Sequence, residues 1–257
     1  MLELSYVILL LVAGYLLFAS FLYFYQRRLI YYPVQPDPEF DADEIVIDNN
    51  GTRLHGWVLN PGKAKAVIYF GGNSELISHR ADFFESVFGD YSIYLMNYRG
   101  YGKSEGSPSE AGLFSDSLAI YDNLRPRHDS ITAYGRSLGS GVAVYLAAMR
   151  PLERLILLTP YDSITELARK LYPMFPVSYL LKDRFDSAAR APDISVPVLI
   201  TSAERDREIA LEHTLALRQR FVRARVVYQR IAGAAHNDIV EFTEYRELVG
   251  RFLAGED

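Results

Sequence analysis

Apolar residues follow two kinds of pattern along this chain. Residues 4–25 form one apolar run without a charged side chain, whereas the remainder alternates short apolar runs with amphipathic stretches. As a helix, the first run would measure roughly 33 Å at about 1.5 Å per residue, which is enough to cross the hydrocarbon core of a bilayer. We therefore predict one N-terminal transmembrane helix.

The residues around this run favour a retained anchor over a cleaved signal peptide or a buried core helix. The chain begins Met1, Leu2, Glu3, without the basic start of a signal peptide, and no convincing cleavage site follows. Aromatic rings and arginines close the run, as at a membrane interface; they are Tyr23, Phe24, Tyr25, Arg27, Arg28, Tyr31 and Tyr32. We predict a single-pass membrane protein with an anchor and juxtamembrane segment over residues 1–32. The arginines favour a globular domain on the cytoplasmic side of the membrane, and the opposite orientation is the alternative.

Beyond a proline-containing connector, short runs rich in β-branched and aromatic residues predict eight strands. The turn signal Asn50, Gly51 separates the first two and predicts an antiparallel hairpin. Later runs alternate with helical patterns, as in the βαβ units of a parallel sheet. The predicted strands span residues 44–48, 54–59, 66–70, 92–97, 131–135, 155–159, 198–202 and 225–231, and the predicted helices span residues 76–88, 110–124, 138–149, 208–221 and 238–253.

This order predicts one α/β domain over residues 33–257, with a mostly parallel sheet and helices on both faces. Residues 162–192 break the alternation, so we expect a small cap-like insert over about residues 160–192. The composition, 49% hydrophobic and 23% charged, is sufficient for a large core. We expect a monomer.

Charge and composition exclude several classes of function. The net charge of −5 and the scattered basic residues make nucleic acid an unexpected partner. The chain has no cysteine, which excludes disulfides, thiolate metal sites and a cysteine nucleophile. It also lacks an HExxH motif, so we expect neither a metal nor another cofactor.

One motif carries chemistry. Gly135, Ser137 and Gly139 spell GxSxG between a predicted strand and a predicted helix. In a nucleophile elbow the serine takes a strained backbone conformation at this junction, and glycines two residues away on either side avoid clashes. The position therefore predicts that Ser137 is a nucleophile, rather than part of an ordinary tight turn.

A serine hydroxyl needs a base, and the base needs a carboxylate to orient it. Two histidines follow Ser137. His213 falls in a helical pattern, where a surface or packing role is expected, whereas His236 lies in a loop of small residues after the last predicted strand. We predict His236 as the base and Asp206, in the loop after the preceding strand, as the acid. Glu204 is the alternative acid.

Acyl transfer also needs hydrogen-bond donors for the developing oxyanion. The backbone N–H of the residue after the nucleophile supplies one, which here is Leu138. The second is expected from the loop Gly71, Gly72, Asn73, directly after the third predicted strand, and we choose Asn73.

Together these residues resemble the membrane-anchored, bud-emergence type of α/β-hydrolase, a branch grouped with serine aminopeptidase-like domains. The resemblance covers nearly the whole chain. It rests on the aromatic run at 24–33, the loop at 69–75, NYRGYGKSEGSPSE at 97–110, GRSLG at 135–139, TPYDSI at 159–164, Asp206 and His236. The chain departs from many relatives at Gly71, where they have histidine, and at Asn97, where they have aspartate.

The resemblance implies an α/β-hydrolase fold and hydrolysis of an ester, thioester or amide by Ser137, Asp206 and His236. Its members include protein-depalmitoylating enzymes and bacterial hydrolases. The expected partners are a small-molecule or acylated substrate and the lipid bilayer, and the predicted anchor favours lipid or acylated-protein substrates because it would concentrate the site at the membrane. The apolar residues 171–181 fit either an acyl pocket or a cover for the core. The alternative to an enzyme is a membrane-tethered binding or scaffold protein that keeps the fold without turnover.

A nucleotide-binding function is disfavoured by spacing. Gly102, Lys103 and Ser104 match the end of a phosphate-binding loop, GxxxxGK[ST], but the first glycine of that motif would be Asn97. The motif should also open a helix, whereas Gly106 and Pro108 follow it.

Overall fold

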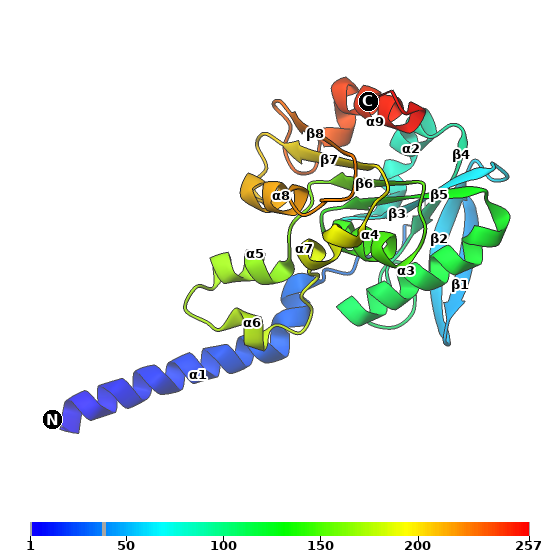
Figure 1. Ribbon diagram of the computed structural model, residues 1–257. Helices are drawn as coiled ribbons and strands as arrows, with labels where there is room; N and C mark the ends of the chain where they lie inside the picture. The colour runs from blue at the N-terminus through cyan, green and yellow to red at the C-terminus, as the bar shows by residue number, and fades with distance from the viewer. Residues whose placement is uncertain (1, 38–39, 257) are drawn as a thin grey trace.

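The structure is a computed structural model, and it describes residues 2–37 and 40–256. Its centre is one sheet of eight strands in the order β1-β2-β4-β3-β5-β6-β7-β8 (Figure 1). The strands are β1 Asp43–Asn49, β2 Thr52–Leu59, β3 Lys65–Phe70, β4 Tyr91–Met96, β5 Ser130–Arg136, β6 Arg154–Leu158, β7 Val198–Ala203 and β8 Val226–Ile231. Strands β1 and β2 form the predicted hairpin, β2 pairs antiparallel with β4, and every later pair is parallel. All eight predicted strands are confirmed.

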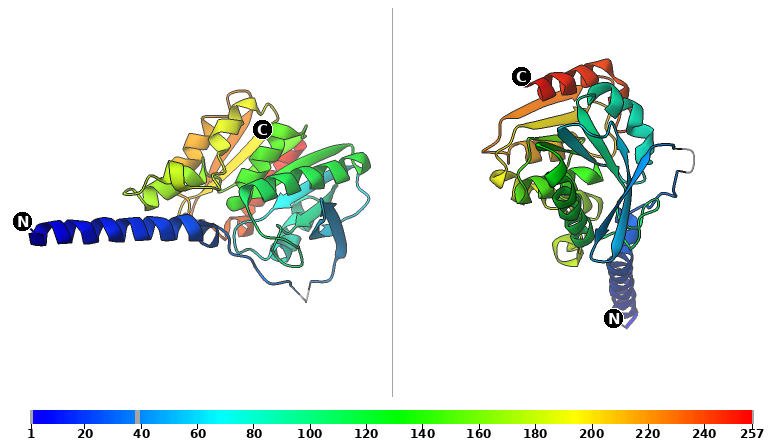
Figure 2. Two further views of the ribbon diagram at one scale, coloured as in Figure 1. Left: turned by 90° about the horizontal axis from the view of Figure 1, so that it is seen from below. Right: turned by 90° about the vertical axis from the view of Figure 1, so that its right-hand side faces the viewer.

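Helices cover both faces of the sheet, as predicted (Figures 1 and 2). One face carries α3 Glu110–Leu124, α4 Leu138–Met149 and α8 Leu211–Arg218, and the other carries α2 Ala81–Val87 and α9 Thr243–Ala254. Successive strand residues point to opposite faces. In β3, Ile68 and Phe70 enter the core under α4, whereas Val67 and Tyr69 enter the core under α2. Because helices cover both sides, the central strands are buried along nearly their whole length and are rich in apolar residues.

Three predicted helices differ in detail. The helix predicted over residues 76–88 is a 3₁₀ turn, η1 Ile77–Arg80, followed by α2, and the last predicted helix is η4 Ile239–Glu241 followed by α9. A further 3₁₀ turn, η2 Arg125–Arg127, follows α3, whose predicted bounds are confirmed. The helix predicted to begin at residue 208 begins at Leu211, because Oδ1 of Asp206 accepts the N–H groups of Glu208 and Ile209 and holds them in a turn.

The predicted insert joins β6 to β7 and projects from the sheet (Figure 1). It contains the short helices α5 Ile164–Leu171, α6 Val177–Leu180 and α7 Ser187–Arg190, and the turn η3 Ala191–Asp193. Ser163 begins α5 by accepting the N–H of Glu166 at 3.0 Å, as an N-cap should. The insert lies beside the C-terminal half of the first helix.

The first helix, α1 Leu2–Ile30, extends away from the domain (Figure 2). Over Glu3–Ile30 it is long and apolar enough to cross a membrane, with a mean hydropathy of 2.4, and none of that apolar window is buried. A buried core helix is therefore the wrong alternative for this segment. One prediction at its end is also wrong, because Tyr31 is buried in the protein core instead of facing lipid headgroups.

Candidate active site

Ser137 lies at the junction of β5 and α4 in a strained conformation. Its φ of 49° and ψ of −118° fall where residues with a Cβ rarely occur. The backbone N–H of Ser137 donates to the carbonyl of Leu158 at 2.9 Å, which ties the turn to β6. At Gly135, a Cβ would come within 2.7 Å of the Cα of Ser140. The glycines of GxSxG are thus required by close packing of the strand against the helix.

Asp206 and His236 meet in the loops that follow β7 and β8. The Nδ1 atom of His236 lies 2.8 Å from Oδ2 of Asp206, and their side chains are only 4% and 6% exposed. Burial opposes ionisation of Asp206, but hydrogen bonds from His236 and from two backbone N–H groups outweigh it, so the pKa of Asp206 lies below its usual range. Glu204 instead accepts the N–H of Gly233 at 2.8 Å. Of the two candidate acids, the geometry pairs Asp206 with the imidazole.

The other nitrogen of His236 faces a residue that the sequence did not single out. Nε2 lies 3.4 Å from Oε2 of Glu208, whose side chain is 56% exposed. Within residues 2–37 and 40–256, no hydrogen bond joins the Ser137 hydroxyl to His236. Hydrogen bonds of this kind commonly tighten only when substrate is bound. The signal for Glu208 was its position two residues after Asp206 in the same loop.

The predicted oxyanion donors are available. Among the described residues, the backbone N–H groups of Asn73 and Leu138 have no hydrogen-bond partner. The neighbouring N–H of Gly72 is already used, because it donates to Oε2 of Glu75 at 2.5 Å. Asn73 and Leu138 border the same pocket as Ser137, and two unpaired N–H groups beside a serine hydroxyl are what stabilisation of an oxyanion requires.

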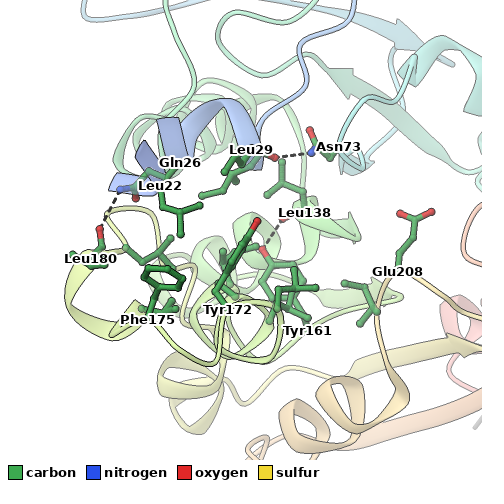
Figure 3. A pocket seen from close by; sticks show the side chains of 18 of the residues that line it. Leu22, Gln26, Leu29, Asn73, Leu138, Tyr161, Tyr172, Phe175, Leu180 and Glu208 are labelled. Carbon is green, nitrogen blue, oxygen red and sulfur yellow. Dashed lines mark hydrogen bonds between the residues drawn. The ribbon is translucent and has the colours of Figure 1, made fainter. Parts of the chain in front are cut away.

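An apolar pocket of about 360 Å³ leads away from Ser137 (Figure 3). In Figure 3, Asn73 and Glu208 lie toward one side, and Leu22 and Phe175 lie toward the other. The walls come from α1, from the insert and from the loops around Ser137; they include Leu22, Tyr23, Gln26, Leu29, Ile30, Leu138, Tyr161, Ile164, Leu167, Leu171, Tyr172, Phe175, Val177, Leu180, Leu181 and Ile209. The segment 171–181 therefore lines a cavity that reaches Ser137.

A buried ionic cluster behind the elbow was missed by sequence reasoning. Oε2 of Glu75 lies 3.1 Å from Nη1 of Arg136, and their side chains are 6% and 4% exposed. Glu75 also accepts from Nε of Arg80 at 2.5 Å, and Arg136 donates to the backbone carbonyl of His236 at 3.3 Å. The cluster links the loop at residues 71–75, the elbow and the loop of His236. The charged residue inside GxSxG was its only local signal.

Replacing Glu75 by glutamine is expected to lower the free energy of unfolding by about 3 kcal/mol at pH 7, because Arg136 would stay buried without its counter-charge. Burial opposes ionisation of Glu75, but Arg136 and Arg80 outweigh it and hold its pKa below the usual range. A lowered pKa stabilises the fold above the pKa of the unfolded carboxyl, about 4.3, and that contribution is lost as the pH falls through the folded-state value. The difference between wild type and variant should therefore narrow in acid.

Thermal unfolding of wild type and Glu75→Gln at several pH values measures this effect. Glu85→Gln is the matched control, since Glu85 is exposed on α2 and should shift the melting temperature little. Equal melting temperatures for wild type and Glu75→Gln at pH 7 would contradict the role assigned to the cluster.

His213 forms a second histidine–carboxylate pair. Its Nδ1 lies 2.9 Å from Oδ1 of Asp162, and the histidine is 7% exposed. Within the described part of the chain it makes no hydrogen bond to Ser137 or Asp206. Of the two roles expected from its helical position, packing is the one observed.

Comparison with known proteins agrees with this fold. No protein-family model matches the chain. An uncharacterized protein of Mycobacterium tuberculosis is 33% identical over 254 residues, which cover 91% of this chain and 89% of that protein. Alpha/beta hydrolase domain-containing protein 17C of Xenopus tropicalis is 31% identical over 203 residues, 77% of this chain and 64% of that protein. The structure of the Pyrococcus furiosus esterase Pf2001 superposes with a TM-score of 0.66 at 20% identity, covering 88% of this chain and 98% of that one.

The sheet order, the serine elbow and the superposition on this esterase define an α/β-hydrolase fold. Within this fold, the chain belongs to the same family as the Mycobacterium tuberculosis protein, with which it aligns over nearly its whole length.

Proposed function

We propose that this protein is a membrane-anchored serine hydrolase of the bud-emergence type, which cleaves an ester, thioester or amide bond through an acyl-enzyme on Ser137. The observation that carries the proposal is the buried hydrogen bond of 2.8 Å between His236 and Asp206. Asp206 follows β7 and His236 follows the neighbouring parallel strand β8. Both residues therefore lie at the carboxyl end of the sheet, as does Ser137 at the end of β5. If Ser137 were only part of a turn, nothing would require a hydrogen-bonded imidazole at that end of the sheet.

Each residue has one role in this mechanism. His236 accepts the proton of the Ser137 hydroxyl through Nε2 as the oxygen attacks the carbonyl carbon of the substrate. Asp206 accepts the Nδ1–H, which fixes the tautomer and stabilises the imidazolium. The N–H groups of Asn73 and Leu138 bind the oxyanion, and His236 then protonates the leaving group. A water molecule, deprotonated by the same imidazole, hydrolyses the acyl-enzyme and regenerates Ser137.

Glu208 must move for this mechanism to start. Its carboxylate occupies the side of the imidazole that has to reach Ser137, at 3.4 Å from Nε2. Because the side chain is 56% exposed, a rotation into water costs little packing, and the hydrogen bond that Glu208 accepts from Asn237 at 3.0 Å would be exchanged for one from water. An arriving substrate with an apolar acyl group would exclude water and favour that rotation.

The pocket supports a substrate with an apolar acyl group. Its volume of about 360 Å³ and its aliphatic and aromatic walls suit a hydrocarbon chain better than a charged or sugar-like group. An anchor formed by α1 would hold the site next to lipids and acylated proteins. The esterase named among the structural neighbours is consistent with this reaction class.

A fluorophosphonate probe tests the proposal, because it reacts covalently with an activated serine. The wild-type protein should be labelled, and Ser137→Ala should lose all labelling. Ser115→Ala is the matched control, since Ser115 is exposed on α3 and should leave labelling intact. A non-catalytic scaffold would give no labelling that depends on Ser137. Ester, thioester and aminoacyl-amide substrates, assayed with the same preparations, then identify the bond.

A further inference from the structure

The surface of the insert is unlike that of a loop in water. Residues 171–181 contain no charged side chain, although Lys170 and Lys182 lie directly on either side. Three of the large side chains in this segment are strongly exposed: Leu171 at 72%, Met174 at 78% and Tyr179 at 86%. Large exposed apolar side chains gathered in one uncharged segment indicate a site of contact with a partner or a membrane.

The tip of the insert lies against the middle of α1. The ring of Phe175 stacks on Tyr15 with 4.8 Å between centroids and lies 5.4 Å from the ring of Phe18. The hydroxyl of Tyr15 donates to the carbonyl of Met174 at 3.0 Å. Figures 1 and 2 show α5 and α6 alongside the C-terminal half of α1. The apolar face of the insert therefore continues the exposed apolar surface of the helix.

The apolar segments of α1 and of the insert end at the same level. Arg27 pairs with Asp183 at 2.9 Å. Gln26 donates to the carbonyl of Leu180 at 3.1 Å and accepts the N–H of Lys182 at 2.6 Å. The polar boundary that ends the apolar run of α1 thus coincides with the one that ends residues 171–181. Two segments crossing one membrane surface would share such a boundary.

The spacing along α1 gives the depth of the tip. Tyr15 and Arg27 are twelve residues apart, which corresponds to about 18 Å along a helix. The hydrocarbon core is roughly 30 Å thick, so with Arg27 at its surface the tip would reach near the middle of the bilayer.

Several backbone groups of the tip need no water. Pro173 and Pro176 have no N–H to satisfy, and the N–H of Phe175 donates to the carbonyl of Tyr172 at 3.1 Å. The carbonyl of Met174 is satisfied by Tyr15, a residue of α1. Non-helical backbone is tolerated at membrane depth only where protein satisfies its polar groups.

We propose that residues 171–181 insert into the bilayer beside α1, and that the pocket between them opens to the hydrocarbon, so that an acyl chain reaches Ser137 from the lipid. The partner is the acyl-chain region of a membrane. The insertion itself requires only that α1 spans the bilayer, whereas the path of the acyl chain rests on the proposed hydrolase function.

Single cysteines test the insertion directly, because the native chain contains none. Met174→Cys is labelled with an environment-sensitive NBD fluorophore in the full chain, reconstituted in phosphatidylcholine vesicles with and without brominated acyl chains. Leu10→Cys on α1 is the reference for a membrane-embedded site, and Val46→Cys on β1 is the reference for water. Strong bromine quenching at Met174 and Leu10 but not at Val46 is the expected result.

Two outcomes would overturn the insertion. Quenching at Leu10 with none at Met174 would place the insert in water beside an inserted helix. Absence of quenching at both Leu10 and Met174 would contradict the membrane anchor as well as the insertion. Neither result depends on catalysis, so fluorophosphonate labelling of the wild type reports the proposed function independently.

Leu22→Trp tests the path of the acyl chain, because the larger ring would fill the pocket between α1 and the insert. The ratio of turnover of a sixteen-carbon p-nitrophenyl ester to that of the acetyl ester should fall by roughly ten-fold. An unchanged ratio, with fluorophosphonate labelling retained, would overturn the pocket assignment without affecting the proposed function. Absence of labelling in the wild type would instead contradict the proposed hydrolase function.

Discussion

His236→Ala is expected to lower kcat for ester hydrolysis by about 10⁶-fold, an effect as large as that expected from loss of Ser137 itself. Without the imidazole, the Ser137 hydroxyl keeps its proton and remains a weak nucleophile. Asp206→Asn should cost about 10⁴-fold, because the asparagine NH2 group can donate to Nδ1 of His236 and so favours the wrong tautomer of the ring. Steady-state turnover of a p-nitrophenyl ester measures both variants.

The matched control for His236 is His213→Gln. His213 is also a buried histidine that follows Ser137 and pairs with a carboxylate, Asp162. Turnover by His213→Gln should stay within a few-fold of wild type, with any loss of folded protein corrected by thermal unfolding. Should His213→Gln lose the activity while His236→Ala keeps it, the assignment of the base would be wrong.

Gly139→Ala is expected to lower the free energy of unfolding by about 4 kcal/mol or more, which places it among the most damaging single substitutions. A Cβ at this position would lie 2.6 Å from the carbonyl oxygen of Gly71, and closer still to that of Phe70. Both are backbone atoms at the end of β3, so a side chain cannot rotate away to make room. Relief of the overlap would have to displace α4 from the sheet, together with Ser137.

Thermal unfolding measures this effect, and the melting temperature should fall by about 10 °C. Gly250→Ala is the control, because nothing lies within 4 Å of a Cβ there and α9 is a regular helix. That substitution should be neutral or stabilise the fold by up to about 1 kcal/mol. A Gly139→Ala protein with an unchanged melting temperature would show that the elbow tolerates a wider spacing from β3 than the structure has.

The end of α1 is joined to the proposed oxyanion loop. The side chain of Asn73 donates to the carbonyl of Ile30 at 2.6 Å and accepts the N–H of Tyr32 at 2.9 Å. Its oxygen also accepts from the hydroxyl of Tyr101 at 2.8 Å. Residues 30–32 are therefore packed against the site, although the sequence suggested assigning residues 1–32 to a separate anchor. The helix that would hold the protein at the membrane also fixes the loop that would bind the oxyanion.

Local patterns in the sequence predicted most of the framework. All eight strands, the hairpin at Asn50 and Gly51, and the elbow at Ser137 follow from periodicity and from residues with special backbone preferences, which act within a few positions. The order of parallel strands then brings Asp206 and His236 to one edge, because loops at the carboxyl ends of such strands converge. Local spacing left Glu204 open as the acid, since both carboxylates follow the same strand.

Contacts between distant segments were decided only by the tertiary structure. The pocket joins Leu22 to Phe175, the ionic cluster joins Glu75 to Arg136, and Glu208 faces His236 across two loops. None of these contacts can be predicted from a periodic pattern in the sequence, because each depends on how helices and loops pack once the sheet has formed. The sequence by itself therefore determined the fold and indicated the candidate catalytic residues. Packing of α1 against the insert decided the shape of the cavity, since that shape is a property of two surfaces and not of either segment alone.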